Sequence, residues 1–192
     1  MPIISYFTDD FVDKTGINYL IRAFLGEART KGYEFDVSGE VLPGLSMIAT
    51  YSYLPYAKIL KDNLAVFDEN NVFVGNSLAN QGHRMFLAAE HTGTLWNVYE
   101  FRNEMLRGLR IGGGIQGVGQ RQGDLDNSFQ LPYYVLGNLM TSYQFKAGPL
   151  RMLAQLNVYN VSDETYYAGT NGGTFITVGA PRTFLGSLRV DY

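Results

Sequence analysis

The 192-residue sequence predicts an all-β fold, an antiparallel, up-and-down transmembrane β-barrel segment, and three observations lead to this class. Seven segments alternate apolar and polar residues with the period of two with which a β-strand shows its two faces. Short connections rich in Gly, Pro or charge alternate strictly with long ones. Aromatic residues gather near the ends of the strands, and no segment has the roughly 18 apolar residues of a membrane-spanning helix.

The alternating segments begin at Tyr33 and recur to the end of the sequence. The first two, Tyr33–Val41 and Leu45–Tyr53, each place aromatic and aliphatic residues on one face and mostly polar residues on the other. The third, about 92–101, is less regular because Trp96 and Val98 fall on the polar side. The remaining predicted strands are about 109–116, 133–145, 150–158 and 184–192, and residues 1–26 are expected to hold the remains of an eighth.

The connections fall into two classes. The short ones are 42–44, 102–107 and 146–149, and the long ones are about 59–91, 122–132 and 161–181. In an up-and-down barrel, strict alternation puts all short turns at one rim and all long loops at the other. Outer-membrane barrels show this asymmetry between periplasmic turns and extracellular loops. We therefore expect the short-turn rim to be periplasmic.

The aromatic residues predict where the membrane surfaces lie. Tyr51 and Tyr53 fall toward the long-loop end of their strand. Those expected near the short-turn rim are Phe101, Tyr143, Phe145 and Tyr192. Amphipathic rings favour the headgroup level, so these two groups are predicted to be the membrane-interface girdles. The alternative is that Tyr and Phe are present only because they form strands well.

Composition and charge exclude several functions. A net charge of -3 gives no basic surface for nucleic acid. The absence of cysteine excludes disulfides, thiolate catalysis and Cys-based metal sites. His83 and His91 are interpreted as polar residues in or beside a long loop, so we expect no metal site, no catalytic residues and no enzyme. The Asp124 and Asp126 side chains are interpreted as solvated loop charges because their spacing fits no EF-hand.

The glycine run 112–114 lacks the Lys and Ser/Thr that complete a phosphate-binding loop. It lies within a predicted strand, where small residues allow curvature or close packing. The first residues lack the basic and apolar regions of a signal peptide, so none is expected.

The order of motifs resembles one family. Residues 27–45 are similar to the "GE.RSKG.E.D.SG...PGL" stretch of TonB-dependent siderophore receptors. Further stretches resemble that family in the same order: 49–53, 75–84, 96–101, 112–121, 131–133, 156–167 and 179–183. The pattern departs at residues 80–84 and matches poorly in 1–26. Residues 1–192 as a whole thus look like the C-terminal part of a receptor barrel.

This resemblance implies about 7–8 strands of a barrel of about 22 strands in the bacterial outer membrane, in contact with its lipid. It implies no resident cofactor, and a ferric siderophore as the transported ligand of the full receptor. No plug domain is expected in this sequence, so TonB would act only through an N-terminal plug region that the sequence lacks. The resemblance also implies that the barrel assembly machinery recognises the C-terminal strand. The segment by itself is not expected to transport.

Five residues are candidates for ligand binding, because aromatic rings and guanidinium groups suit large, often anionic iron chelates. They are Arg121, Tyr166, Tyr167, Phe175 and Arg182. The alternative is structural: the two tyrosines continue their strand above the membrane, and Arg182 pairs with a lumen carboxylate such as Glu34 or Glu40.

Two other protein classes remain open at this point. A self-standing eight-stranded outer-membrane barrel would have a structural or adhesive role. A soluble, lipocalin-like ligand-binding barrel would turn its apolar face inward.

Overall fold

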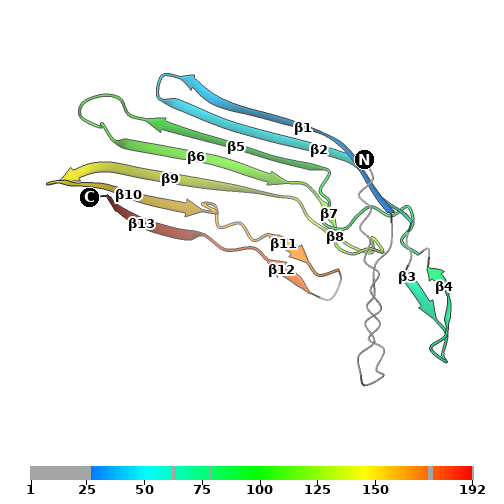
Figure 1. Ribbon diagram of the computed structural model, residues 1–192. Coiled ribbons are helices and arrows are strands. Elements are labelled where there is room, and N and C mark those ends of the chain that lie inside the picture. Colours follow the sequence, from blue (N-terminus) through cyan, green and yellow to red (C-terminus); the bar gives the residue numbers. More distant parts are fainter. Residues whose placement is uncertain (1–26, 62–63, 78, 173–174, 192) are drawn as a thin grey trace.

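The structure is a computed structural model that describes residues 27–61, 64–77, 79–172 and 175–191. In these ranges it contains β-strands and no helix, and thus no helix able to cross a membrane. Seven strands form one antiparallel sheet in the order β1-β2-β5-β6-β9-β10-β13 (Figure 1). Their bounds are β1 Glu27–Leu42, β2 Leu45–Lys61, β5 His91–Glu100, β6 Leu109–Val118, β9 Tyr134–Ala147, β10 Leu150–Tyr159 and β13 Thr183–Asp191. Each strand of this sheet pairs with the sheet strands that precede and follow it along the chain, which is the predicted up-and-down order.

Three small hairpins occupy the three long connections. They are β3 (Leu64–Phe67) with β4 (Phe73–Ser77), β7 (Arg121–Gln122) with β8 (Gln130–Leu131), and β11 (Tyr167–Thr170) with β12 (Ile176–Val178). Figure 1 shows all three beyond the same end of the sheet, opposite the short turns. The predicted sorting of short and long connections is therefore confirmed.

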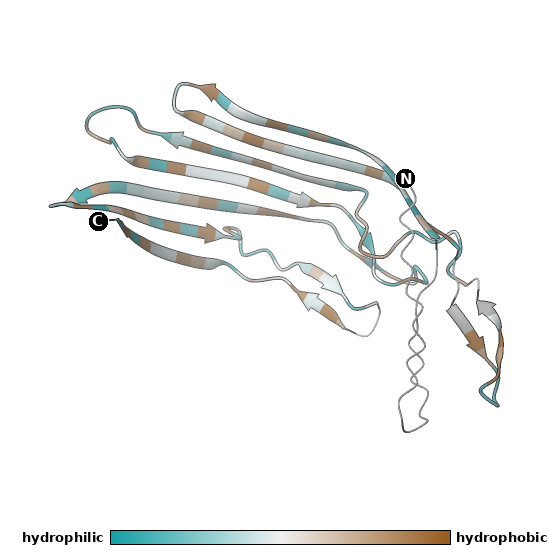
Figure 2. Ribbon diagram, viewed as in Figure 1, coloured by the Kyte–Doolittle hydropathy of each residue, from teal (hydrophilic) through white to brown (hydrophobic). Residues whose placement is uncertain are grey.

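The register joins the apolar faces of the separate strands into one surface. Val37 lies opposite Ala49, Ala49 opposite Leu95, and Leu95 opposite Ile115. Residues directly opposite each other project from the same side of a sheet. We call this side the apolar face and the other side the polar face; the alternation along each strand is visible in Figure 2. Ile115 remains 54% exposed, because no second layer covers the apolar face in the described structure.

The polar face carries ion pairs near the short turns. Arg110 donates to Glu100 at 2.7 Å, and Arg102 pairs with Glu40. The pairing of Arg182 with Glu34 or Glu40, expected in the structural alternative, is wrong for the described residues. Arg182 immediately precedes β13 at the long-loop end, whereas Glu40 lies beside the turn between β1 and β2, and Arg182 has no ion pair among the described residues.

Trp96 and Val98 interrupt the alternation of β5 because they pack on glycines of β6. A Cβ at Gly114 would lie 2.5 Å from Cε3 of Trp96, and one at Gly112 would lie 3.1 Å from Cγ2 of Val98. Trp96 and Val98 thus occupy space on the polar face that these two glycines of β6 leave open. Close packing, proposed for this glycine run from the sequence, is confirmed.

The first two strands are longer than predicted. β1 begins at Glu27 rather than Tyr33, and β2 continues to Lys61 rather than ending at Tyr53. Backbone pairing needs no apolar side chains, so the ladder continues after the apolar alternation ends. The eighth strand predicted in residues 1–26 lies outside the described residues, as does Tyr192.

Candidate functional site

Asn160 fixes the chain where it leaves the sheet after β10. Its side chain is 3% exposed, and its backbone adopts a φ of 52°. The carboxamide accepts from the Glu164 N–H at 2.9 Å and donates to the carbonyls of Glu164 at 2.9 Å and Ala180 at 3.1 Å. Asn tolerates this left-handed conformation better than most residues. Asn160 therefore holds the chain that leaves β10 against the chain that enters β13.

Arg121 joins the second long connection to the third. Its guanidinium donates to the carbonyls of Tyr167 at 2.7 Å and Ala168 at 3.0 Å, and lies 5.3 Å from the centroid of the Tyr134 ring. The residue is 6% exposed. Arg121 is thus a buried connection between β7 and β11, and its ligand-binding role stays a prediction.

Tyr166 is packed in the same region. Its ring lies 4.6 Å from that of Tyr134. A Cβ at Gly179 would lie 2.0 Å from the Tyr166 ring, so this position accepts only glycine while the ring keeps its place. Tyr166 therefore fills the gap between the third connection and β9.

The other three candidate side chains are exposed. Phe175 is 70% exposed, and Tyr167 and Arg182 are also exposed. Sequence reasoning missed Tyr133, which is 73% exposed and immediately precedes β9. The motif at 131–133 was the available signal, but sequence could not show which of two adjacent tyrosines, Tyr133 or Tyr134, is buried. The ligand-binding role of these side chains stays a prediction.

Arg84 and Asn127 fix the first long connection to β2 and to the second connection. Arg84 donates to the carbonyls of Leu54 at 2.6 Å and Ala88 at 3.1 Å. Asn127 pairs with the backbone of Arg84, accepting from its N–H at 2.9 Å and donating to its C=O at 2.8 Å. Nearby, the His83 ring nitrogen Nδ1 lies 2.9 Å from the carbonyl oxygen of Leu125. All three long connections are thus linked through side chains.

Asp124 corrects one sequence interpretation. It is 8% exposed rather than solvated, and its carboxylate accepts from the Ser128 N–H at 2.8 Å. It acts as a turn residue, because its side chain satisfies a backbone N–H four residues on. Within the described residues, no three His, Asp or Glu side chains lie close enough to hold a metal ion.

A polar cavity of about 240 Å³ lies beside this network. Arg84, Glu90, Arg121 and three glutamines line it. Nε of Arg121, a donor, and Oε1 of Gln122, an acceptor, are buried without a protein partner.

Two aromatic rows lie at opposite ends of the apolar face. At the long-loop end the Tyr51 hydroxyl lies 2.8 Å from Nδ1 of His91, and the Tyr53 ring stacks on His91 at 4.9 Å. At the short-turn end the ring pairs are Tyr99 with Phe101 at 4.9 Å and Tyr143 with Phe145 at 5.8 Å.

The distance between the rows suits a membrane. From His91 to Phe101 the chain rises about 34 Å along the strand, or about 26 Å along the barrel axis at a typical tilt. The apolar band of an outer-membrane barrel is about 25 Å tall. The interface role of these aromatics stays a prediction that this spacing supports.

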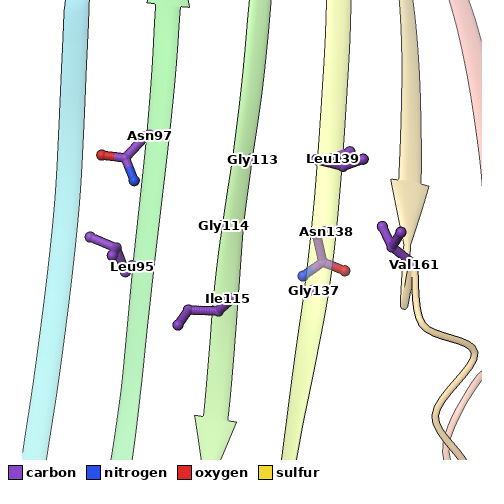
Figure 3. Close-up of a pocket in the computed structure, with 9 residues that line it drawn as sticks. All are labelled: Leu95, Asn97, Gly113, Gly114, Ile115, Gly137, Asn138, Leu139 and Val161. Atoms are coloured by element: carbon purple, nitrogen blue, oxygen red, sulfur yellow. The ribbon is translucent and has the colours of Figure 1, made fainter.

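Between the rows, the apolar face has a hollow of about 410 Å³ (Figure 3). Leu95, Ile115 and Leu139 form its sides, and Gly113 and Gly137 leave its floor without side chains. Asn97 is a polar group in this otherwise mostly aliphatic lining. The hollow therefore suits a hydrocarbon chain better than a charged ligand.

Comparison with known proteins decides what this sheet belongs to. The family model described as "TonB dependent receptor-like, beta-barrel" matches residues 3–161. The chain belongs to the TonB-dependent receptor family. It is 33% identical to the metal-pseudopaline receptor CntO of Pseudomonas aeruginosa, over 87% of this chain and 21% of that protein. It is 29% identical to the ferrioxamine B receptor of Salmonella typhimurium, over 85% of this chain and 21% of that protein.

Solved structures of TonB-dependent receptors contain the same fold. The siderophore receptor PiuA of Acinetobacter baumannii matches with a TM-score of 0.69 at 23% identity, over 87% of this chain and 22% of that one. The pyoverdine receptor FpvA of Pseudomonas aeruginosa matches with a TM-score of 0.60 at 28% identity, over the same shares. The chain thus spans about a fifth of the length of the curated relatives above.

Family membership fixes the environment of the two faces. TonB-dependent receptors are outer-membrane β-barrels, so the apolar face is the outer surface and the polar face lines the interior. The predicted fold class and outer-membrane location are confirmed. The family is one of receptors, which decides against the soluble lipocalin-like barrel and against a purely structural or adhesive one.

Replacing Arg121 tests whether it is structural in the TonB-dependent receptor. We expect Arg121→Leu to release the β11–β12 hairpin, because it removes two charge-assisted hydrogen bonds to backbone carbonyls. Chymotrypsin should then cleave after Tyr167 or Phe175 at least about 10-fold faster, read by mass spectrometry of the detergent-purified receptor. Gln120→Leu, at an exposed neighbour, is the control. An unchanged cleavage rate in Arg121→Leu would argue against the structural role.

Proposed function

We propose that this chain forms part of the barrel wall of an outer-membrane receptor that takes up ferric siderophores or related metal chelates. The similarity to a metal-pseudopaline receptor, at 33% identity over 87% of the chain, carries this proposal. Relatives named for ferrioxamine B and ferripyoverdine support the same ligand class. The chelate is cargo of the complete receptor, and no resident cofactor is part of the proposal.

The long-loop rim offers suitable chemistry for such a ligand. Tyr133, Tyr167 and Phe175 present exposed rings, and Arg182 presents an exposed guanidinium without an ion pair among the described residues. Rings and guanidinium groups pack against large planar or anionic chelates. The linked loops hold these groups near one rim, so a ligand can contact several of them at once.

The partners follow from the same proposal. TonB would energise uptake through an N-terminal plug region of the complete receptor, and this barrel segment alone would not transport. Outer-membrane lipid would contact the apolar face. The barrel assembly machinery would engage the strand that ends the sheet, β13.

Binding of chelates by the complete receptor tests this function. The receptor carrying this segment is purified from outer membranes and titrated with ferrioxamine B, ferripyoverdine and metal-pseudopaline. We expect one of these probes to bind, and the Tyr167→Ala, Phe175→Ala double variant to bind it about 10-fold more weakly, because two ring contacts are lost.

The control is Met105→Ala, which removes a side chain that is 88% exposed at the opposite rim. If the folded receptor binds none of the three probes, the proposed ligand class is wrong. If the double variant binds as tightly as the wild type, the class stands but these two residues do not contact the ligand.

A further inference from the structure

A pair of lysines, Lys31 and Lys58, lies on the outer surface just beyond the aromatic row at the long-loop end. Tyr33 and Tyr53 face each other in that row. Lys31 precedes Tyr33 by two residues in β1 and therefore projects from the same face. Tyr56 lies directly opposite Lys31, and Lys58 lies opposite Arg29, so Tyr56 and Lys58 also face outward.

A bulge is what keeps Tyr56 and Lys58 on this face. Leu54 and Pro55 of β2 together oppose the single residue Gly32 of β1, where the register shifts. Without the extra residue, every side chain of β2 beyond Tyr53 would change face. Gly32 fits the bulge because a Cβ there would lie 2.5 Å from the carbonyl oxygen of Tyr53.

The two lysines converge on one ring and lack a counter-ion. Nζ of Lys31 lies 5.6 Å from the Tyr56 ring centroid, and Nζ of Lys58 lies 6.0 Å from the same centroid. Among the described residues, neither has a carboxylate within ion-pair distance. The flanking Arg29 and Lys61 differ, because each lies 3.6 Å from Glu27. The two ammonium groups over one ring repel each other, and an anion bound between them would offset this repulsion.

The height of the lysine pair matches the lipid headgroups. Lys31 and Tyr56 lie about 7 Å along the strand beyond the aromatic row, or about 5 Å along the barrel axis. The polar headgroup layer extends roughly 5–7 Å beyond the hydrocarbon core on each side. At this level an outward-facing cation meets the headgroups of the extracellular leaflet.

We propose that Lys31, Lys58 and Tyr56 form a binding site for the phosphate of an anionic outer-leaflet lipid. Both ammonium groups donate to the phosphate oxygens, and the Tyr56 ring supports the two lysine stems. A lipid is favoured over a protein partner because the site continues the lipid-facing surface without a break at the bulge. The site does not depend on which chelate the receptor takes up.

Native mass spectrometry of the receptor in dodecyl maltoside tests the site. The probe is dioctanoyl phosphatidic acid; dioctanoyl phosphatidylcholine and inorganic phosphate distinguish an anionic lipid from a zwitterionic lipid and from free phosphate. We expect the Lys31→Gln, Lys58→Gln double variant to bind phosphatidic acid about 30-fold more weakly, from the contribution of two lysines at a charged membrane surface. Lys31→Arg, Lys58→Arg should keep binding within about threefold, because the charge is retained.

The matched control is Arg107→Gln, Lys146→Gln, which makes the same charge change in exposed residues at the short turns. Wild-type affinity in the Lys31, Lys58 glutamine variant would overturn the proposal. Equal binding of inorganic phosphate and phosphatidic acid would also overturn it, because the site would then select the anion and not the lipid. Heat-modifiable gel migration of each variant shows that a loss of binding is not a loss of folding.

Discussion

Ile115→Arg is expected to destabilise the receptor by about 2–4 kcal/mol in a lipid bilayer, because it places a charge on the outer surface near mid-membrane depth. Ile115 is 54% exposed on the apolar face, four residues along the ladder from the His91 level. The adjacent Gln116 is also exposed but faces the barrel interior. Gln116→Arg should therefore cost no more than about 1 kcal/mol, since the interior is polar and hydrated.

Guanidinium unfolding in phosphatidylcholine vesicles, followed by heat-modifiable migration, measures both variants. Because the two positions are neighbours in β6, they share the strand and the depth, and they differ in the face and in the residue that is replaced. Equal costs would contradict the assignment of the two faces. A larger cost at Gln116 would mean that the apolar face is directed inward.

Asn160→Ala is the second change with a large expected effect. It removes the three side-chain hydrogen bonds that join Asn160 to Glu164 and Ala180, and it places alanine at a φ of 52°. At about 1 kcal/mol for each bond, the junction loses about 2–4 kcal/mol of local stability. Amide hydrogen exchange at residues 161–164 should become about 30- to 1,000-fold faster, because local opening governs exchange.

Asn160→Gly separates the two contributions. Glycine adopts the left-handed conformation without strain, so its effect reports the lost hydrogen bonds alone and should be the smaller of the two. Ser162→Ala, at an exposed neighbour, is the control and should leave exchange unchanged. If Asn160→Gly exchanges like the wild type, the side chain does not hold the junction.

The strands and loops could be predicted because they depend on local pattern. Alternation at Leu45–Tyr53 and in the six other segments placed the sheet strands, and Gly, Pro and charge marked the turns. The ends of β1 and β2 could not be predicted, because backbone pairing continues through Lys31 and Lys58 after the apolar pattern stops. Trp96 falls on the polar side of the alternation, and the reason, its packing on Gly114 of the next strand, is not contained in the local pattern.

The candidate site was predicted only in part. Residue type singled out Arg121 and Tyr166 as ligand-binding candidates, which stays a prediction, but the contacts that these two residues make come from groups distant in sequence. The carbonyls that Arg121 binds belong to Tyr167 and Ala168, 46 and 47 positions away. No local pattern carries that information. The same holds for Asp124, whose burial depends on how the second long connection folds.

The sequence alone determined an amphipathic antiparallel sheet with sorted loops, because a period of two and turn chemistry are properties of neighbouring residues. Tertiary structure alone decided that Arg121 connects two loops, that Asn160 joins two strand ends, and that a bulge carries Lys58 to the outer face. Each of these depends on which backbone atoms come opposite one another across strands. Strand register and long-range contacts determine which atoms come opposite one another, and no single segment of the chain specifies either.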